Sequence, residues 1–318
     1  MEIGSFIELQ FAKGKEYYGD ENNTARLNTG RAAVYHAFRL SGCDAVWLPY
    51  YQCDTVRGFL KRKGVSLKFY NIDSGFNPVN LNPGENEAVL LVNYFGVMSN
   101  VRMQTLASLY KHPIIDNCQA FFAKPVENAF NIYSARKFAG VPDGAYVLGK
   151  GAQNFCEEYP QGFSSDTSAF LLERIEYGCE GRAYEHRTLN ESRIDSEDIM
   201  LMSKLTRTIL DSVDYGEIID KRRENFETAQ SLFGGVNRLC LQYCDKNCVP
   251  MVYPLVYEDD SLLERLLANG HFQGHWWSYL LDEMPENSFE YYLSRYIIPV
   301  TIDQRYGREE IEYIRSIV

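Results

Sequence analysis

The chain has 318 residues, a formal net charge of −11 and a composition that is 45% hydrophobic and 24% charged. This length and composition predict a globular protein with one large domain and a smaller one. The acidic balance argues against a dedicated nucleic-acid or acidic-membrane partner. The sequence contains no signal-peptide pattern and no apolar run of about 18 residues, so we expect a cytoplasmic protein without a membrane span.

The eight cysteines form no C-x-x-C pair. In a chain without an export signal they are expected to be reduced thiols rather than disulfides. Cys240, Cys244 and Cys248 are evenly spaced, but the Val249-Pro250 sequence after them indicates strand and loop rather than one helix face. We therefore predict buried or loop thiols and no metal site.

The first half of the chain alternates between strand and helix patterns. This alternation predicts an α/β fold with a mainly parallel sheet and helices on both faces. Ligands of such sheets bind beyond the carboxyl ends of the strands, where Pro49, Asp116 and Lys137 are expected. Strands are predicted at 45–49, 66–72, 88–96, 113–117, 130–137 and 144–150, and helices at 31–42, 55–64 and 101–111.

The second half is organised differently. Residues 150–195 are polar and poorly periodic, which indicates a long irregular region. A helical pattern runs from Asp195 to about Leu232, and strand and helix patterns alternate after Gly234-Gly235. We predict a large domain at 1–230 and a small C-terminal α+β domain at 231–318.

Lys137 follows a predicted strand in the segment Ile132-Tyr-Ser-Ala-Arg-Lys137. A lysine in this position can hold an aldehyde cofactor as an imine, while the hydroxyl of Ser134 contacts the cofactor's phosphate. Taken alone, the segment is more typical of a surface lysine in a basic Arg136-Lys137 turn.

Asp116 ends an apolar strand in the segment Ile114-Ile115-Asp116-Asn117-Cys118-Gln119. A carboxylate beside a pyridine nitrogen keeps the ring protonated, and the protonated ring withdraws electrons from a developing carbanion. Gln119 can hydrogen-bond the ring hydroxyl. The alternative for Asp116 is an ordinary helix cap after a strand.

Thr29-Gly30-Arg31 begins the first predicted helix. A glycine turn into a helix presents free backbone N–H groups and the positive end of the helix dipole, which suits a phosphate, and Arg31 adds charge. Simple helix capping would give the same pattern. An anion site, a strand-end carboxylate and a strand-end lysine follow one another in this order along the chain. Together the three signals favour a cofactor site over the separate alternatives.

With these motifs the chain resembles the DegT/DnrJ/EryC1/StrS family of sugar aminotransferases, fold type I enzymes that depend on pyridoxal 5'-phosphate (PLP). The family's ring-stacking aromatic residue aligns with Cys53, and we expect Tyr51 to be the ring partner. The family's phosphate-binding serine aligns with Ile132, and Ser134 is expected to replace it. The resemblance rests on Thr29–Ala33, Leu48–Thr55, Asp116 with Gln119, Lys137 with Asp143-Gly144, and Ile298–Tyr306.

The resemblance implies a three-layer fold like that of aspartate aminotransferase, and a homodimer. The family has an Asn-containing segment that comes from the neighbouring subunit, and Leu189-Asn190 corresponds to it only loosely. It implies an aminotransferase whose substrates are an amino donor and a nucleotide-linked keto-sugar, with PLP bound to Lys137 as a Schiff base. Asp116 and Lys137 are the catalytic residues. The expected cofactor-binding residues are Gly30, Arg31, Tyr51, Asp116, Gln119, Ser134 and Lys137.

Two other functions remain open from the sequence. The same scaffold can carry out another PLP reaction, such as dehydration of a sugar, although some relatives of that kind replace the lysine with histidine. A non-catalytic ligand-binding or regulatory role is the second alternative.

Overall fold

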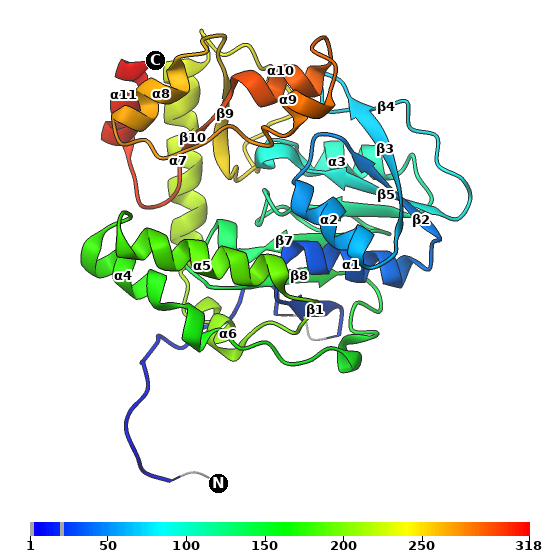
Figure 1. The fold of residues 1–318 in the computed structure, drawn as a ribbon, viewed down its shortest axis with the longest axis vertical. Helices are drawn as coiled ribbons and strands as arrows, with labels where there is room; N and C mark the ends of the chain where they lie inside the picture. The colour runs from blue at the N-terminus through cyan, green and yellow to red at the C-terminus, as the bar shows by residue number, and fades with distance from the viewer. Residues whose placement is uncertain (1–2, 20–21) are drawn as a thin grey trace.

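The computed structural model describes residues 3–19 and 22–318. Within these residues, a large sheet and a two-stranded sheet form the framework (Figure 1). The strands of the large sheet are β1 (Thr24–Leu27), β2 (Ala45–Pro49), β3 (Ser66–Ile72), β4 (Pro78–Val79), β5 (Glu87–Val92), β6 (Pro113–Asp116), β7 (Phe130–Ser134) and β8 (Ala145–Leu148).

The large sheet has the strand order β1-β8-β7-β6-β5-β2-β3-β4. Its five central strands, in the order β3, β2, β5, β6 and β7, are parallel to one another. The antiparallel pairs lie toward the two edges, at β3–β4, β7–β8 and β8–β1. The predicted α/β fold with a mainly parallel sheet is confirmed.

Helices connect and cover these strands (Figure 1). The first, α1, begins after Thr29, whose hydroxyl accepts a hydrogen bond from the N–H of Ala32, and ends at Gly42, whose φ of 66° is in the left-handed region that favours glycine. The helices are α1 (Gly30–Ser41), α2 (Asp54–Arg62), α3 (Asn100–Ala107), α4 (Ala169–Tyr177), α5 (Arg182–Ser196), α6 (Lys204–Leu210), α7 (Tyr215–Phe233), α8 (Leu262–Ala268), α9 (Leu280–Glu283), α10 (Phe289–Tyr296) and α11 (Arg308–Ile317).

The two faces of the large sheet pack into different hydrophobic clusters. Successive residues of a strand point to opposite faces, so Ile114 packs in the cluster that contains α1, and Ile115 packs in the cluster that contains Tyr51 and Tyr94. We call these the α1-side cluster and the tyrosine-side cluster. The sheet is therefore the middle layer of three.

The second sheet pairs β9 (Val252–Val256) with β10 (Ile297–Thr301) in antiparallel register. Its strands pack with α7, α8 and α11 around a separate cluster that includes Phe233, Tyr253 and Ile311. In Figure 1 these elements lie together at the upper left. The predicted division of the chain at residue 230 stays a prediction.

The irregular region expected at 150–195 is corrected by the structure, because it contains the helical hairpin α4–α5. Only Ala183, Asn190 and Ile194 of α5 are buried. The helix therefore has few apolar residues that recur at the spacing of a helix face. The carboxylate of Glu173 in α4 pairs with Arg182 and His186 of α5. Long-range pairing, rather than a local pattern, holds this hairpin together.

Candidate active site

Asp116 is the last residue of β6, in the interior of the large sheet. It is 7% exposed, and its Oδ1 atom accepts a hydrogen bond of 2.9 Å from the backbone N–H of Cys118. This bond closes a turn rather than a helix, so the carboxylate is fixed at the carboxyl edge of the sheet.

Lys137 ends the short 3-10 helix η2 (Ala135–Lys137), which directly follows β7. Its side chain is exposed, and no hydrogen bond or ion pair of its amine is found among residues 3–19 and 22–318. The neighbouring Arg136, by contrast, is paired with Glu191 of α5. The amine of Lys137 is therefore accessible beside an anchored neighbour.

The buried thiol of Cys118 connects the predicted residues. Burial raises the pKa of Cys118 well above its ordinary value, the carboxylate of Asp116 raises it further, and the ammonium of Lys137 opposes both. One thiol therefore lies within electrostatic range of both charged groups. The motifs gave no signal for Cys118 beyond its position between Asp116 and Gln119.

The beginning of α1 packs against the same thiol. A Cβ atom added at Gly30 would lie 2.9 Å from the Sγ atom of Cys118, a distance that real Cβ atoms essentially never show. Among the described residues, the N–H groups of Gly30 and Arg31 have no hydrogen-bond acceptor, as expected for the first turn of a helix. The structure thus brings the helix start and Asp116 together at Cys118, and Lys137 lies at the end of the neighbouring strand β7.

Arg31 is buried, but its guanidinium has a protein partner. Its Nη2 atom lies 2.5 Å from the Oδ1 atom of Asp195, a half-exposed residue near the end of α5. The pair neutralises the positive charge that the sequence placed at the helix start. Asp195 was not predicted at the site, because nothing local in the sequence associates it with residue 31.

Ser134 ends β7 and is 6% exposed. It has the same strand parity as Ile132, which packs in the α1-side cluster together with Cys118. Its hydroxyl therefore belongs to the side of the sheet on which α1 begins.

Gln119 supports the neighbouring strand end. Its Oε1 atom accepts a 2.5 Å hydrogen bond from the N–H of Phe95, whose φ of 57° lies in the left-handed region. A Cβ at Gly96 would lie 2.6 Å from the carbonyl oxygen of Gln119, so this approach requires glycine. No acceptor for the Nε2 group of Gln119 is found within the described part of the chain.

Tyr51 is fully buried in the tyrosine-side cluster, whereas Cys118 belongs to the α1-side cluster. Its ring packs edge-on against Trp277 at 4.5 Å and lies 5.7 Å from that of Tyr94. Cys53 packs against the α1-side cluster, and its thiol interacts electrostatically with Cys118. The packing therefore groups Cys53, and not Tyr51, with the predicted site residues.

Neither of the two surface cavities described contains Asp116 or Lys137 in its lining. One lies at the second sheet, and the other, of about 470 Å³, lies at the opposite end of the large sheet's strands, near Lys111 and Pro125. In the described ranges, no group of three or more His, Cys, Asp or Glu residues is arranged to hold a metal ion. No helix in those ranges has both the length and the apolar character needed to cross a membrane.

No protein-family model matches the sequence, and no curated protein matches it. Solved structures do match. The sugar aminotransferase CalS13 from Micromonospora echinospora aligns with a TM-score of 0.62 and 12% identity, over 92% of this chain and 86% of its own. A DegT DnrJ EryC1 StrS aminotransferase from Brucella abortus gives a TM-score of 0.58 at 13% identity, over 92% and 84% of the two chains.

The chain shares the fold of these structures. A third structure with this fold, the E. coli GDP-4-keto-6-deoxy-D-mannose-3-dehydratase with bound hydrated PLP, aligns with a TM-score of 0.61 and 16% identity, over 92% and 87% of the chains. The resemblance stated from the motifs is thereby confirmed for the fold. Because the sugar aminotransferase fold includes a dehydratase, the activity must be argued from the site itself.

Proposed function

We propose that the chain is a PLP-dependent aminotransferase that transfers an amino group from an amino donor to a keto-sugar, with a nucleotide-linked sugar as the acceptor. The observation that carries this proposal is the arrangement around Cys118. The Oδ1 atom of Asp116 accepts from the N–H of Cys118, the first turn of α1 packs on its sulfur, and Lys137 follows β7, the strand next to β6. A strand-end acid, a strand-end amine and a helix start thus meet at the carboxyl edge of the sheet.

The residues present fit PLP, which supplies an aldehyde and an electron-withdrawing ring. The N–H groups of Gly30 and Arg31 and the hydroxyl of Ser134 suit the phosphate. Because Asp195 holds the guanidinium of Arg31, we assign Arg31 a backbone contact in preference to a charged one.

Each of these residues has a chemical role. The amine of Lys137 would hold the aldehyde and, once the amino donor has displaced it, would move a proton to and from the reacting carbon. The carboxylate of Asp116 would keep the ring nitrogen protonated. The Nε2 group of Gln119 would be free to donate to the ring hydroxyl, because its Oε1 atom is bonded to Phe95.

The walls of the ring site are proposed to be thiols. Cys118 and Cys53 would both border the ring, because Cys118 belongs to the α1-side cluster and Cys53 packs against it. This assignment replaces Tyr51, whose ring is enclosed by Trp277 and Tyr94. A sulfur wall makes fewer contacts with a flat ring than an aromatic wall, so modest affinity for PLP is expected.

The visible spectrum of the purified protein tests the proposal. With PLP, the wild-type protein is expected to be yellow and Lys137→Ala to lack that band. Lys246→Ala, which removes an exposed lysine elsewhere, serves as the matched control and should retain it. A band of equal strength in Lys137→Ala would contradict the assignment.

Dehydration of a sugar is the second candidate, because one structure with the same fold is a dehydratase. Lys137 favours amino transfer. The two reactions differ in the sugar product, since transfer leaves the donor's nitrogen on the sugar, whereas dehydration leaves a keto-sugar that has lost one oxygen and carries no nitrogen. Mass spectrometry of the sugar formed from glutamate and keto-sugar acceptors therefore separates them.

A homodimer is proposed from exposed apolar side chains. Ile175 of α4 is 83% exposed and Leu189 of α5 is 65% exposed, and both lie on the α4–α5 hairpin. Ile3 and Phe6 are also almost fully exposed, in an N-terminal segment that extends away from the body of the protein in Figure 1. Groups of exposed apolar residues mark interaction surfaces. Light scattering should give twice the chain mass and a smaller value for Ile175→Asp.

We also propose a cytoplasmic location and a division of the chain into 1–230 and 231–318. All eight cysteines are free thiols, which is the state favoured in a reducing compartment. The second sheet has a hydrophobic cluster separate from those of the large sheet, which supports a small C-terminal domain.

A further inference from the structure

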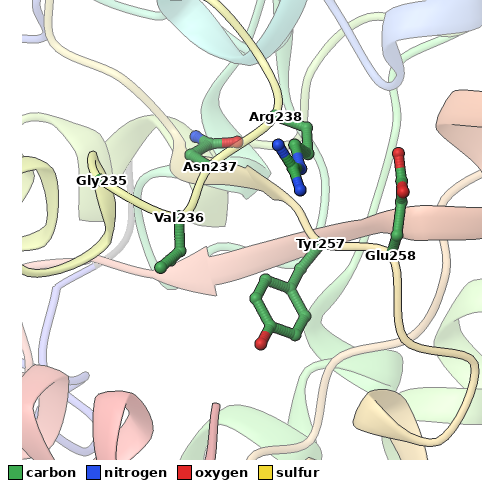
Figure 2. A pocket seen from close by; sticks show the side chains of 6 residues that line it. All are labelled: Gly235, Val236, Asn237, Arg238, Tyr257 and Glu258. Carbon is green, nitrogen blue, oxygen red and sulfur yellow. The ribbon is translucent and has the colours of Figure 1, made fainter.

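A cavity of about 370 Å³ lies at the second sheet, between the end of α7 and the end of β9. Figure 2 shows its lining residues, which come from two segments of the chain. They are Gly235, Val236, Asn237, Arg238, Tyr257 and Glu258. None of them belongs to the site around Cys118.

The wall of this cavity is tied to the sheet through Asn237. Its Oδ1 atom accepts 2.9 Å hydrogen bonds from the N–H groups of Leu239 and Val256, and its Nδ2 group donates to the carbonyl of Pro254 at 2.9 Å. The N–H of Arg238 donates to the carbonyl of Val256 at 2.9 Å. These bonds fix the backbone at Arg238, whose side chain is exposed to solvent.

Two opposite charges line the cavity without neutralising each other. Within the described residues, the guanidinium of Arg238 has neither a hydrogen bond nor an ion pair. Glu258 is oriented separately, because the hydroxyl of Tyr292 donates to its Oε1 atom at 2.7 Å. Figure 2 shows the two charged groups with open space between them and the ring of Tyr257 lower in the view.

The hydroxyl of Tyr292 is a donor toward Glu258. Burial and the hydrogen bond to Glu258 raise the pKa of Tyr292 to about 12, so its hydroxyl stays protonated at neutral pH and donates. The second carboxylate oxygen of Glu258 is left for a ligand. The ligand therefore needs a cationic group to meet Glu258 and an anionic group to meet Arg238.

We propose that this cavity binds a zwitterionic α-amino acid, with its carboxylate on Arg238, its ammonium on Glu258 and an apolar side chain against Val236 and Tyr257. A phosphate or dicarboxylate would be repelled by Glu258, and a simple amine by Arg238. An α-amino acid carries the two opposite charges that these side chains require. The site needs neither PLP nor Lys137.

Calorimetric titration of the full-length Lys137→Ala protein without PLP tests the proposal, because binding at the Cys118 site is then removed. L-phenylalanine and L-leucine are expected to bind. N-acetyl-L-phenylalanine lacks the ammonium and phenethylamine lacks the carboxylate, so both should bind at least about tenfold more weakly, a difference of about 1.4 kcal/mol.

Variants locate the binding. Arg238→Ala and Glu258→Gln should each weaken L-phenylalanine at least about tenfold. Arg308→Ala, which removes an exposed arginine of α11 paired with Glu312, should leave it unchanged. Absence of saturable binding up to about 10 mM, equal binding of the acetylated compound, or unchanged affinity in Arg238→Ala would each overturn the proposal. Because this protein lacks Lys137, these outcomes are independent of the proposed transferase function.

Discussion

Two residues of one loop, Tyr51 and Cys53, pack on opposite sides of the large sheet. Tyr51 fills the tyrosine-side cluster, where Trp277 and Tyr94 surround it. Cys53 packs against the α1-side cluster, which contains Cys118. On one side of the sheet Tyr51 is therefore enclosed by aromatic rings, and on the other Cys53 and Cys118 share the cluster next to Asp116. Changes on the α1 side should alter cofactor binding, and changes on the tyrosine side should alter stability.

Asp116→Asn gives the largest expected effect on the α1 side. The amide lacks the charge that keeps the ring nitrogen protonated, so kcat should fall by about 10²- to 10⁴-fold. The free energy of unfolding should change little, since the Asn side-chain oxygen still accepts from the N–H of Cys118. Steady-state kinetics and urea unfolding measure the two quantities. Wild-type turnover in Asp116→Asn would remove the carboxylate from the proposed mechanism.

Tyr51→Ala is the matching change on the tyrosine side. Removing a fully buried ring should lower the free energy of unfolding by about 3–5 kcal/mol, as measured by urea unfolding. Tyr51→Phe is the control. The hydroxyl of Tyr51 is buried without a hydrogen-bond partner, so its removal should not destabilise the protein. A large loss of PLP affinity in Tyr51→Phe, with stability unchanged, would show that Tyr51 takes part in PLP binding.

Gly30→Ala tests how closely α1 packs on Cys118. The added Cβ would meet the sulfur at 2.9 Å, so we expect a cost of about 1–3 kcal/mol in stability and weaker PLP binding. Replacing Cys118 with Ala in the same chain should recover most of both losses. Additive effects of the two substitutions would show that the helix start and the thiol act separately.

Cys53→Phe gives the smallest effect and sharpens the comparison between the two loop residues. An aromatic wall should tighten PLP binding by about 0.5–1.5 kcal/mol, measured by fluorescence or absorbance titration. Cys53→Ser, which keeps the size and removes the sulfur, is the control. An affinity unchanged by Cys53→Phe would place the ring away from this residue.

Much of the fold was predictable from local patterns. The strand and helix alternation predicted the parallel sheet, and the Thr29 cap and Gly42 marked the two ends of α1. Motif order also placed Asp116 and Lys137 at neighbouring strand ends. These features are encoded by residues close together in the chain.

Contacts between residues far apart in the chain could not be predicted from the motifs. Tyr51 packs against Trp277, and the charge of Arg31 is neutralised by Asp195. Helix α5 has few apolar residues at helical spacing, and its Arg182 and His186 pair with Glu173 of α4. No local pattern reports such partners, so the sequence could not assign them.

Reduction of the PLP-loaded protein with borohydride, followed by peptide mass spectrometry, tests the central claim most directly. The account predicts that the added mass of the reduced cofactor is found on the peptide that contains Lys137, and on no other lysine. Modification at a different lysine, or no modification at saturating PLP, would contradict it.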